Sequence, residues 1–460
     1  MSEETEPITA ATGDGQGLVD KLTSLAKRRG FVFPSSEIYG GLNAVWDYGP
    51  LGVRLRRNVR ESWWRRVVEL RRDVEGIECA ILMNPKVWVA SGHVDAFTDP
   101  LVDCLGSCHR RWRQDQLGGD RCPDCGGELS APRRFNLMFK TFVGPVEEET
   151  ARVYLRPETA QGMFVNFKNV LQSSRQRLPF GIAQVGRSFR NEISPGNFIF
   201  RSREFEQMEM EWFCPPGEDE PWFHYWCEDQ RQWFLALGIR EANLRLRPHA
   251  PEELAHYALA ATDIEYRFPF GWGELEGIAR RGDYDLRRHQ EVSGKDLTYL
   301  DPVSGEHRLA YVVEPAVGVD RTALTVLLDA YHEEEVQGER RVVLRLAATV
   351  APYQVAVLPL SKNADLMGLA RGLEADLRRR LATDYDETQS IGRRYRRQDE
   401  IGTPLCVTVD FDSLADRAAT IRERDSMAQV RVGFDRLLEV CRAKLGLDEA
   451  APGTGGPAPM

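Results

Sequence analysis

Residues 186–213, GRSFRNEISPGNFIFRSREFEQMEMEWF, restrict the fold of this chain more than any other stretch. They predict a β-hairpin: one strand ends near Glu192, a Ser-Pro-Gly-Asn turn follows, and a second strand starts at Phe198. Its strands carry charges of both signs, on Arg190, Glu192, Arg201, Arg203, Glu204, Glu206, Glu209 and Glu211. Met208, Met210 and Trp212 recur at strand period and are predicted to be core, and Glu211 is predicted to be a solvated strand residue. A sheet with so much fixed charge is expected to bind charged groups.

Length and charge exclude several classes of protein. A chain of 460 residues is long enough for about two to four domains. The net charge of -10 argues against a general nucleic-acid coat, but a local basic patch can still contact RNA. There is no apolar run of about 18 residues and no secretory or transit signal, so a cytoplasmic protein without a membrane span is expected. Residues 1–17 and 447–460 are predicted to be disordered tails.

The predicted secondary structure changes along the chain. Residues 53–76 predict a long amphipathic helix whose basic face is either solvated or a contact for RNA or a second subunit. Residues 309–335, LAYVVEPAVGVDRTALTVLLDAYHEEE, predict a buried strand, a glycine turn and a helix. From Arg341 onward, strands alternate with helices, including a polar stretch at 390–402 and a last helix at 430–445, which favours a separate α/β domain.

Four cysteines form two close pairs in a Gly-rich segment. Cys104 and Cys108 are followed by Cys122 and Cys125, in CLGSCHRRWRQDQLGGDRCPDCGG. This spacing is typical of a Cys₄ zinc ribbon, whose thiolates close a tetrahedral site, and His109 is an alternative ligand. The other interpretation is a loop with free cysteines and no metal.

Three further segments combine arginine with carboxylates: FRNE at 189–192, GVDR at 318–321 and RPET at 156–159. Guanidinium groups bind phosphate oxygens bidentately, and carboxylates suit an ammonium group, a ribose hydroxyl or Mg²⁺. Together these segments fit a nucleoside triphosphate beside a cationic amine. The chain lacks the GxxxxGK[ST] signature, so the site is not a P-loop.

Three stretches of the chain look like motifs 1, 2 and 3 of class II aminoacyl-tRNA synthetases and follow one another in that order. They are YGPLG, then FRNE with FEQMEMEWF, then EPAVGVDR. Together with SSEIYGGLNAVWDYGPLG, RPETAQGMFVNFKNV and RRYRRQDEIGTP, the chain resembles the homodimeric glycyl-tRNA synthetases over residues 18–445. The resemblance implies an α+β catalytic domain at 18–345, built on a six-stranded antiparallel sheet with flanking helices. It also implies insertions near 100–133 and 215–305 and an α/β anticodon-binding domain at 346–446.

The resemblance implies a reaction in which glycine and Mg·ATP form glycyl-adenylate and the glycyl group then passes to tRNA(Gly), in a homodimer. It implies catalytic roles for Arg190, Glu192 and Arg321. It implies an ATP site made of Arg190, Asn191, Glu192, Phe200, Arg201, Ser202, Arg203, Glu204, Phe205, Glu274, Leu275, Gly318, Val319, Asp320 and Arg321. It implies a glycine site made of Arg113, Glu158, Phe205, Glu206, Gln207, Met208, Glu209, Glu314, Pro315, Ala316, Val317 and Gly318. Ala316 departs from the family, because relatives often have a serine there that can contact glycine.

Two alternatives remain open from the sequence. One is a non-catalytic relative that binds nucleic acid, similar to the accessory subunit of mitochondrial DNA polymerase. The other is a class II synthetase for proline, threonine or histidine. The phosphate-binding arginines and the carboxylates of FEQME and RPETAQG favour the glycine enzyme.

Overall fold

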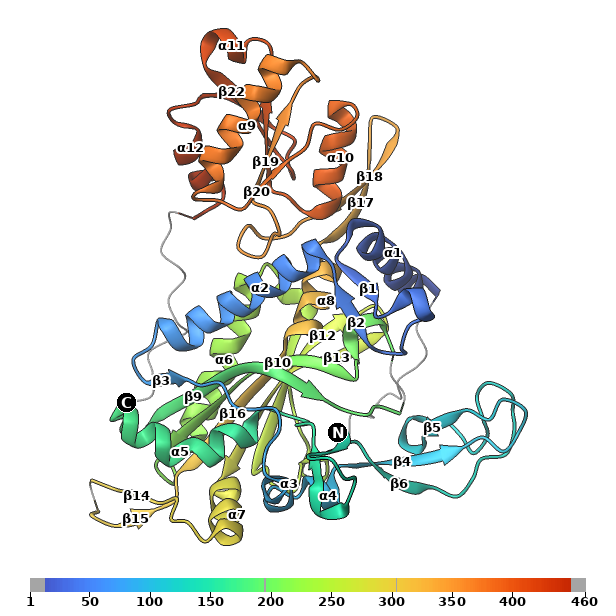
Figure 1. Ribbon diagram of the computed structural model, residues 1–460, viewed down its shortest axis with the longest axis vertical. Helices are drawn as coiled ribbons and strands as arrows, with labels where there is room; N and C mark the ends of the chain where they lie inside the picture. The colour runs from blue at the N-terminus through green and yellow to red at the C-terminus, as the bar shows by residue number, and fades with distance from the viewer. Residues whose placement is uncertain (1–12, 194–195, 303, 448–460) are drawn as a thin grey trace, which may run out of the picture.

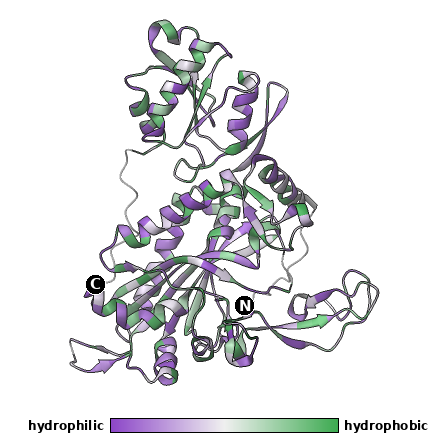
Figure 2. Cartoon of the chain, viewed as in Figure 1, coloured by the Kyte–Doolittle hydropathy of each residue, from purple (hydrophilic) through white to green (hydrophobic). Residues whose placement is uncertain are grey.

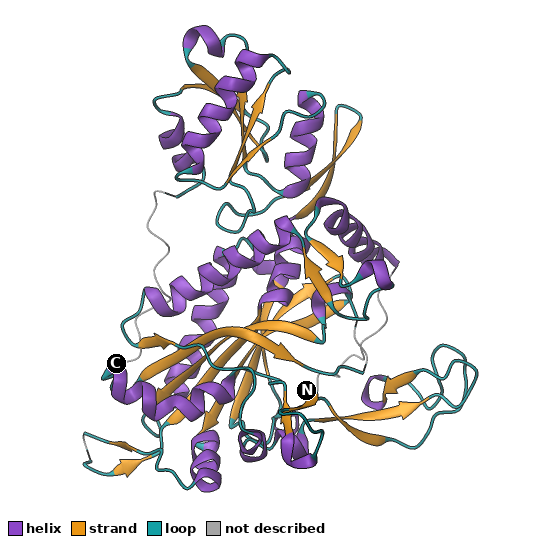
Figure 3. Ribbon diagram, in the orientation of Figure 1, coloured by secondary structure: helices purple, strands orange, loops and turns teal. Residues whose placement is uncertain are grey.

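The computed structural model describes residues 13–193, 196–302 and 304–447. The predicted tails lie largely outside these ranges, but helix α1 (Gly13–Arg29) already occupies residues 13–17. The molecule has a large body around one sheet, a cysteine-rich lobe on one side and a smaller C-terminal body above it (Figure 1). Figure 3 shows the large sheet with helices on both faces.

The central sheet has seven strands in the order β11-β12-β13-β16-β10-β9-β3. Their bounds are β3 Val74–Gly76, β9 Phe180–Phe189, β10 Glu204–Cys214, β11 Leu244–Pro248, β12 Ala260–Phe268, β13 Gly271–Gly282 and β16 Tyr311–Gly318. Six of them pair antiparallel, as predicted, and β3 adds a seventh in parallel to β9. Residues 215–305 were expected to be an insertion, but they supply β11, β12 and β13 of this sheet. Three adjacent strands of the core sheet are therefore encoded where the sequence suggested a peripheral segment.

Each face of the sheet is covered by its own helices. One face packs against α2 (Pro50–Trp64), α6 (Asp219–Ala236) and α8 (Val319–Ala330) in a core that includes Met208, Met210 and Trp212. The other face packs against α5 (Ala160–Ser174) and α7 (Tyr284–Ser293). Hydrophobic and hydrophilic residues mix along α2, as expected for an amphipathic helix (Figure 2). A π-helical turn, Arg65–Glu69, ends the predicted long helix.

The predicted hairpin exists, but its strands are shorter at the turn than expected. β9 and β10 pair from Phe189 with Glu204 to Phe180 with Phe213. β9 ends at Phe189 and β10 begins at Glu204, so Arg190, Glu192 and Phe198 lie in the connection, which includes a 3₁₀ turn at Phe198–Phe200. The regular ladder ends here because the main-chain N–H groups of Asn191 and Arg203 donate to Leu137 and Ala44 and not to the opposite strand.

The remaining elements of the large body flank this frame. They are β1 Val32–Pro34, β2 Trp46–Tyr48, α3 Pro85–Ala90, α4 His93–Ala96, β7 Lys140–Phe142, β8 Arg152–Tyr154, β14 Tyr299–Leu300 and β15 His307–Arg308. The cysteine-rich lobe is a three-stranded sheet in the order β5-β4-β6, with β4 Thr98–Asp103, β5 Arg111–Arg113 and β6 Arg133–Asn136. A hairpin of β17 Tyr331–Val336 and β18 Glu339–Leu344 leads into the C-terminal body and packs on its helix α10 (Ile391–Ile401).

The C-terminal body is the predicted α/β domain, with a separate apolar core. Its sheet has the order β20-β19-β21-β22-β23. The bounds are β19 Val355–Pro359, α9 Ala364–Arg378, β20 Thr383–Tyr385, β21 Leu405–Val409, α11 Ser413–Asp416, β22 Ala418–Glu423, β23 Gln429–Gly433 and α12 Leu437–Lys444. The polar stretch at 390–402 is helix α10, and the expected helix at 430–445 divides into β23 and α12.

Candidate active site

A cavity of about 490 Å³ opens on the α5 face of the central sheet. Most of the predicted site residues line it: Arg113, Glu158, Arg190, Glu192, Phe200, Arg201, Ser202, Phe205, Gln207, Glu209, Glu274, Leu275, Glu314, Ala316, Val317, Gly318, Asp320 and Arg321. These residues come from β10, β13, β16, the connection between β9 and β10, the segment that leads into α5, the start of α8 and the cysteine-rich lobe. Segments far apart in the sequence thus converge on one pocket.

Strand β10 divides its residues between the two faces of the sheet. Phe205, Gln207 and Glu209 line the cavity, because alternate residues of a strand point the same way. Glu206 and Met208 were predicted to contact glycine, but they point to the opposite face. There Met208 is core, and Glu206 forms ion pairs with Arg56 (2.9 Å) and Arg60 (2.9 Å) of α2.

Arg190 lines the cavity from the connection between β9 and β10. Its guanidinium lies 5.4 Å from the ring centroid of Phe97 and 5.3 Å from that of Phe205. Its Nε donates to the carbonyl oxygen of Pro157 (3.1 Å), and its main-chain N–H donates to that of Arg203 (2.9 Å). The two rings and the Pro157 carbonyl fix the side chain, and no carboxylate of the described residues forms an ion pair with it, so its charge is available to an anion.

Arg321 lines the cavity from the first turn of α8. Its Nη1 donates to the carbonyl oxygen of Glu274 (2.8 Å) and lies 3.3 Å from that residue's Oε1. Its guanidinium covers the ring of Phe200 at 4.5 Å. The charge of Arg321, which outweighs burial, lowers the pKa of Glu274 and keeps it ionised.

Three mostly buried carboxylates also line the cavity, those of Glu158, Glu209 and Glu314. Burial raises the pKa of Glu158. The charge of His93 and its hydrogen bond to Glu158, with Nε2 at 3.1 Å, act against burial and bring the pKa below its ordinary value. Burial and then the charge of Glu158 raise the pKa of Glu209 to about 7. Burial raises the pKa of Glu314 to about 8, although its ion pair with Arg281 opposes this. An excess of acidic groups in a buried wall is suited to an incoming ammonium group.

Comparison with known proteins identifies the family. The model of the tRNA synthetase class II core domain (G, H, P, S and T) matches residues 139–397, and that of the anticodon binding domain matches residues 354–444. The chain is 55% identical over 456 residues to the glycine–tRNA ligase of Caldanaerobacter subterraneus subsp. tengcongensis, covering 93% of this chain and 98% of the relative. It is 54% identical over 453 residues to that of Thermobifida fusca, with the same coverage of 93% and 98%. It is 53% identical over 459 residues to that of Bifidobacterium longum, covering 94% of each.

The chain belongs to the glycine–tRNA ligases of class II.

Several residues that the ligase resemblance placed in the site do not line the cavity: Asn191, Arg203, Glu204, Glu206, Met208, Pro315 and Val319. Arg203 donates to the carbonyl oxygens of Asn43 (2.7 Å) and Glu192 (3.2 Å), so it shapes the connection between β9 and β10. Asn191 donates its main-chain N–H to the carbonyl oxygen of Leu137 (2.7 Å). Glu204 pairs with Arg187, and Val319 is core.

Arg156 of the RPET segment is also structural in this ligase. Its Nε donates to the carbonyl oxygen of Arg187 (2.7 Å) and its Nη1 to that of Cys79 (2.8 Å). The guanidinium passes over Gly186, where an added Cβ would lie 2.2 Å from Nη2. Glycine at this position therefore makes room for the buried arginine.

Sequence reasoning missed the residues that hold the carboxylates of the ligase. Thr159 donates its main-chain N–H (3.1 Å) and its hydroxyl to Glu209. Arg281 of β13 donates to both oxygens of Asp285 (2.7 and 2.9 Å) and to Glu314. Thr159 is the last residue of the RPET motif, so the motif could have indicated it. Arg281 becomes a neighbour of Glu314 only through the pairing of β13 with β16.

Arg113 reaches the cavity from the cysteine-rich lobe. Its Nη1 lies 3.0 Å from Asp99 and its Nη2 lies 2.6 Å from Asp115. Asp99, which also lines the cavity, was not predicted. Burial raises the pKa of Asp99 although Arg113 lowers it. Because β4 carries Asp99 and β5 carries Arg113, the shape of this lobe determines where the guanidinium lies.

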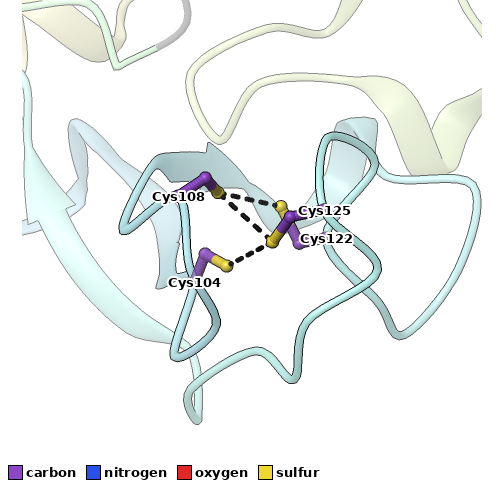
Figure 4. Close-up of side chains that lie close together, drawn as sticks. All are labelled: Cys104, Cys108, Cys122 and Cys125. Atoms are coloured by element: carbon purple, nitrogen blue, oxygen red, sulfur yellow. Dashed lines mark hydrogen bonds between the residues drawn. The ribbon is translucent and has the colours of Figure 1, made fainter.

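The four cysteines of the ligase come together in the same lobe (Figure 4). The Sγ atoms of Cys104 and Cys125 lie 3.4 Å apart, and so do those of Cys108 and Cys122. Cys108 and Cys125 are 3.5 Å apart. Thiols this close, converging on one point, have the arrangement of a tetrahedral zinc site, so the donor set fits that metal.

Within the described ranges, no helix is both long and apolar enough to cross a membrane.

Proposed function

We propose that the cavity activates glycine and ATP in the amino-acid site formed by Glu158, Glu209 and Glu314 and the phosphate site formed by Arg190 and Arg321. The observation that supports this most is that a single cavity is lined both by the two arginines and by the three mostly buried carboxylates. Phosphates suit the arginines and an ammonium group suits the acids. The chain belongs to the class II glycine–tRNA ligases, and both ligands are consistent with that membership.

In the first step, a glycine carboxylate oxygen attacks the α-phosphorus of ATP, and the bond to the leaving pyrophosphate breaks. Arg190, held by Pro157 and two aromatic rings, donates to the oxygens on which negative charge develops. Arg321 binds the outer phosphates. The adenine stacks on the ring of Phe205. Mg²⁺ brought with ATP would neutralise phosphate charge near Glu274, which the neighbouring Arg321 keeps ionised.

In the second step, a hydroxyl of the terminal adenosine of tRNA attacks the glycyl carbonyl carbon. AMP leaves with the electrons of the broken C–O bond, and the hydroxyl proton passes to its phosphate. Binding of the amino acid relies on its ammonium and carboxylate because glycine has no side chain. Exclusion of larger amino acids must come from crowding at the α-carbon, since one methyl group changes a binding free energy by only about 1–3 kcal/mol.

ATP–pyrophosphate exchange with a panel of amino acids tests this assignment. We expect exchange with glycine and little with alanine, serine, proline or threonine. The Glu209→Gln and Glu158→Gln variants should raise the KM for glycine by at least about tenfold and change that for ATP much less, since they remove charge from the ammonium pocket alone. Unchanged glycine KM values in both variants would refute the pocket.

We also propose that Cys104, Cys108, Cys122 and Cys125 hold a structural Zn²⁺. Four thiolates leave no open coordination position, so the metal would stabilise the lobe and take no part in the reaction. Metal analysis of the purified chain should find one zinc per chain. The Cys125→Ser variant should lose it, and Cys79→Ser, which changes a half-buried cysteine outside the cluster, should keep it. Full zinc in Cys125→Ser would refute the site.

A homodimer is the assembly we propose. The loop that follows β1 exposes apolar side chains, with Ile38 at 88% and Tyr39 at 85% of their surface accessible. Such a patch marks an interaction surface. Sedimentation equilibrium should give a dimer for the intact chain and a weaker dimer for a variant with Ile38→Asp and Tyr39→Asp. We assign residues 346–446 to tRNA anticodon binding, in agreement with the family model over 354–444.

A further inference from the structure

Glu211 is a buried acid that the proposed reaction does not use. It follows Glu209 on the cavity face of β10 but lies deeper, and none of its surface is exposed. Neither of its carboxylate oxygens has a hydrogen-bond partner within the described part of the chain. Across the ladder to β9 it faces Ile182, which offers no side-chain donor. The expectation that Glu211 is a solvated strand residue is therefore wrong.

The neighbours of Glu211 are mostly acidic. Glu209, Glu211 and Glu314 each place one carboxylate oxygen within 4.8 Å of the other two. Arg281 of β13 is the cation that faces them, and its donors are already engaged by Asp285 of α7 and by Glu314. Glu211 is thus left with acidic neighbours and no donor.

Electrostatics decides the state of this group. Buried like charges a few ångströms apart cannot all ionise, and an unpaired buried carboxylate costs more than a neutral acid. Burial and then the charge of Glu314 raise the pKa of Glu211 well above its ordinary value. A neutral carboxylic acid has an O–H group to donate, and carboxylate oxygens of Glu209 and Glu314 are within reach of a small side-chain rotation.

We propose that Glu211 is a positioning residue of the amino-acid site: a neutral acid that donates its O–H to Glu209 or Glu314 and holds that carboxylate in place for the glycine ammonium group. The inference rests on the proposed ammonium pocket. Glu209 already accepts from Thr159 and Glu314 from Arg281, so Glu211 completes the set of donors behind the pocket. A divalent cation would need ionised Glu211 and about six oxygen ligands, and it would compete with Arg281 for Glu314.

Two substitutions of Glu211 separate these possibilities by ATP–pyrophosphate exchange. Glu211→Gln keeps a neutral donor of nearly the same shape, so its KM for glycine should stay within about threefold of the parent. Glu211→Leu removes the donor, so its KM for glycine should rise by about tenfold or more while that for ATP stays within about twofold. Equal losses in both variants would show an ionised carboxylate or a cation ligand, and an unchanged KM in Glu211→Leu would show no role; either result overturns the proposal.

A direct readout does not depend on Glu211→Leu folding. The infrared difference spectrum of the parent minus Glu211→Gln at neutral pH should contain the C=O stretch of a protonated carboxylic acid. Its absence overturns the proposal. The Glu209→Gln variant distinguishes this failure from failure of the pocket itself. If Glu209→Gln leaves the KM for glycine unchanged, the ammonium pocket is misplaced. If Glu209→Gln raises that KM and Glu211→Leu does not, only the role of Glu211 is refuted.

Discussion

Arg190 shows how a single cation can be kept ready for a phosphate. Its side chain contacts two ring faces and a carbonyl oxygen, and no carboxylate in the described part of the chain is paired with it. Arg190→Ala should lower glycine-dependent ATP–pyrophosphate exchange by at least about 100-fold, as for other losses of one transition-state donor. Arg187→Ala is the matched control, because Arg187 is more than half exposed and pairs with Glu204 on the same hairpin. Exchange that survives Arg190→Ala would remove this residue from the chemistry.

Glu206 is predicted to matter for stability and not for substrate. It lies on the α2 face, where Arg56 and Arg60 bind its carboxylate. Glu206→Gln should lower the free energy of unfolding by about 2 kcal/mol, the usual size for a lost hydrogen bond to a charged group. The KM for glycine should remain near that of the parent. Denaturant unfolding and exchange kinetics on the same preparation give both quantities, and a raised glycine KM with unchanged stability would contradict the assignment.

The role of the basic residues of α10 could not be inferred from the sequence, because it depends on which groups lie next to them in the fold. From the sequence, Arg393, Arg394, Arg396 and Arg397 could be solvated or contact RNA or another domain. Arg394 is buried and donates to the carbonyl oxygen of Gln389 (2.8 Å), and Arg397 donates to Asp386 (2.8 Å). Arg396 lies 3.2 Å from Glu339 of the β17–β18 hairpin. Much of the run therefore binds the protein itself, and Arg393 remains the exposed member.

At the level of elements, the cysteine-rich lobe joins a proposed metal site to the substrate cavity. Cys104 directly follows β4, which carries Asp99, and Cys108 precedes β5, which carries Arg113. Removing the metal should loosen this hairpin and release Arg113. We expect Cys125→Ser, or treatment with a chelator, to raise the KM for glycine by about tenfold with a smaller effect on that for ATP.

Cys79→Ser should leave both constants unchanged. A metal-free lobe with normal glycine kinetics would show that the lobe supports something other than the amino-acid site.

Much of this arrangement was predictable from motifs, and the part that was not depends on pairing between distant strands. The strand, glycine turn and helix around GVDR are local and appeared as expected. Alternation along β10 could also have excluded Glu206, since it differs in parity from Glu209. By contrast, Arg281 meets Glu314 through the β13–β16 ladder, which contains a register shift between Arg280 and Gly282. No local pattern gives the register of such a ladder, so the partner of Glu314 was missed.

At the scale of the whole molecule, a buried arginine joins the two bodies. Arg341 of β18 donates to Asp399 of α10 (2.8 Å) and to the carbonyl oxygen of Arg424 (2.6 Å), and Arg422 also binds Asp399 (3.2 Å). Removing one partner of such a network leaves a buried charge uncompensated. Arg341→Ala should therefore loosen the C-terminal body.

We expect Arg341→Ala to lower kcat/KM for tRNA charging by about tenfold and to leave ATP–pyrophosphate exchange within about twofold, because exchange needs only the cavity. Its neighbour Arg340 is mostly exposed and pairs with Glu333, so Arg340→Ala is the control. Equal losses in charging and exchange would show that the arginine supports the catalytic body and not the connection.

The acidic wall also gives the molecule a pH dependence. The pKa values of Glu209 and Glu314 are raised from 4.5 to about 7 and about 8, so the folded state holds protons that the unfolded state releases. Stability from these groups is therefore complete below about pH 4.5 and is lost as the pH rises to about 8. The lowered pKa of Glu158 acts below this window.

The thermal midpoint of the catalytic body should fall between about pH 5 and pH 8, and glycine with ATP should restore most of it at the upper end, because the ammonium group replaces the lost protons. A midpoint that rises across this range would contradict the pKa directions.

The alternation of β10 has a consequence for how such an enzyme changes over generations. Positions 205, 207, 209 and 211 face the cavity side, and positions 206, 208, 210 and 212 face the α2 side. In a library that varies every position of the strand, substitutions at the odd-numbered positions should lower turnover. Substitutions at the even-numbered positions should lower the yield of folded protein. New amino-acid preferences are therefore accessible by substitutions two residues apart, with the intervening residues left as they are.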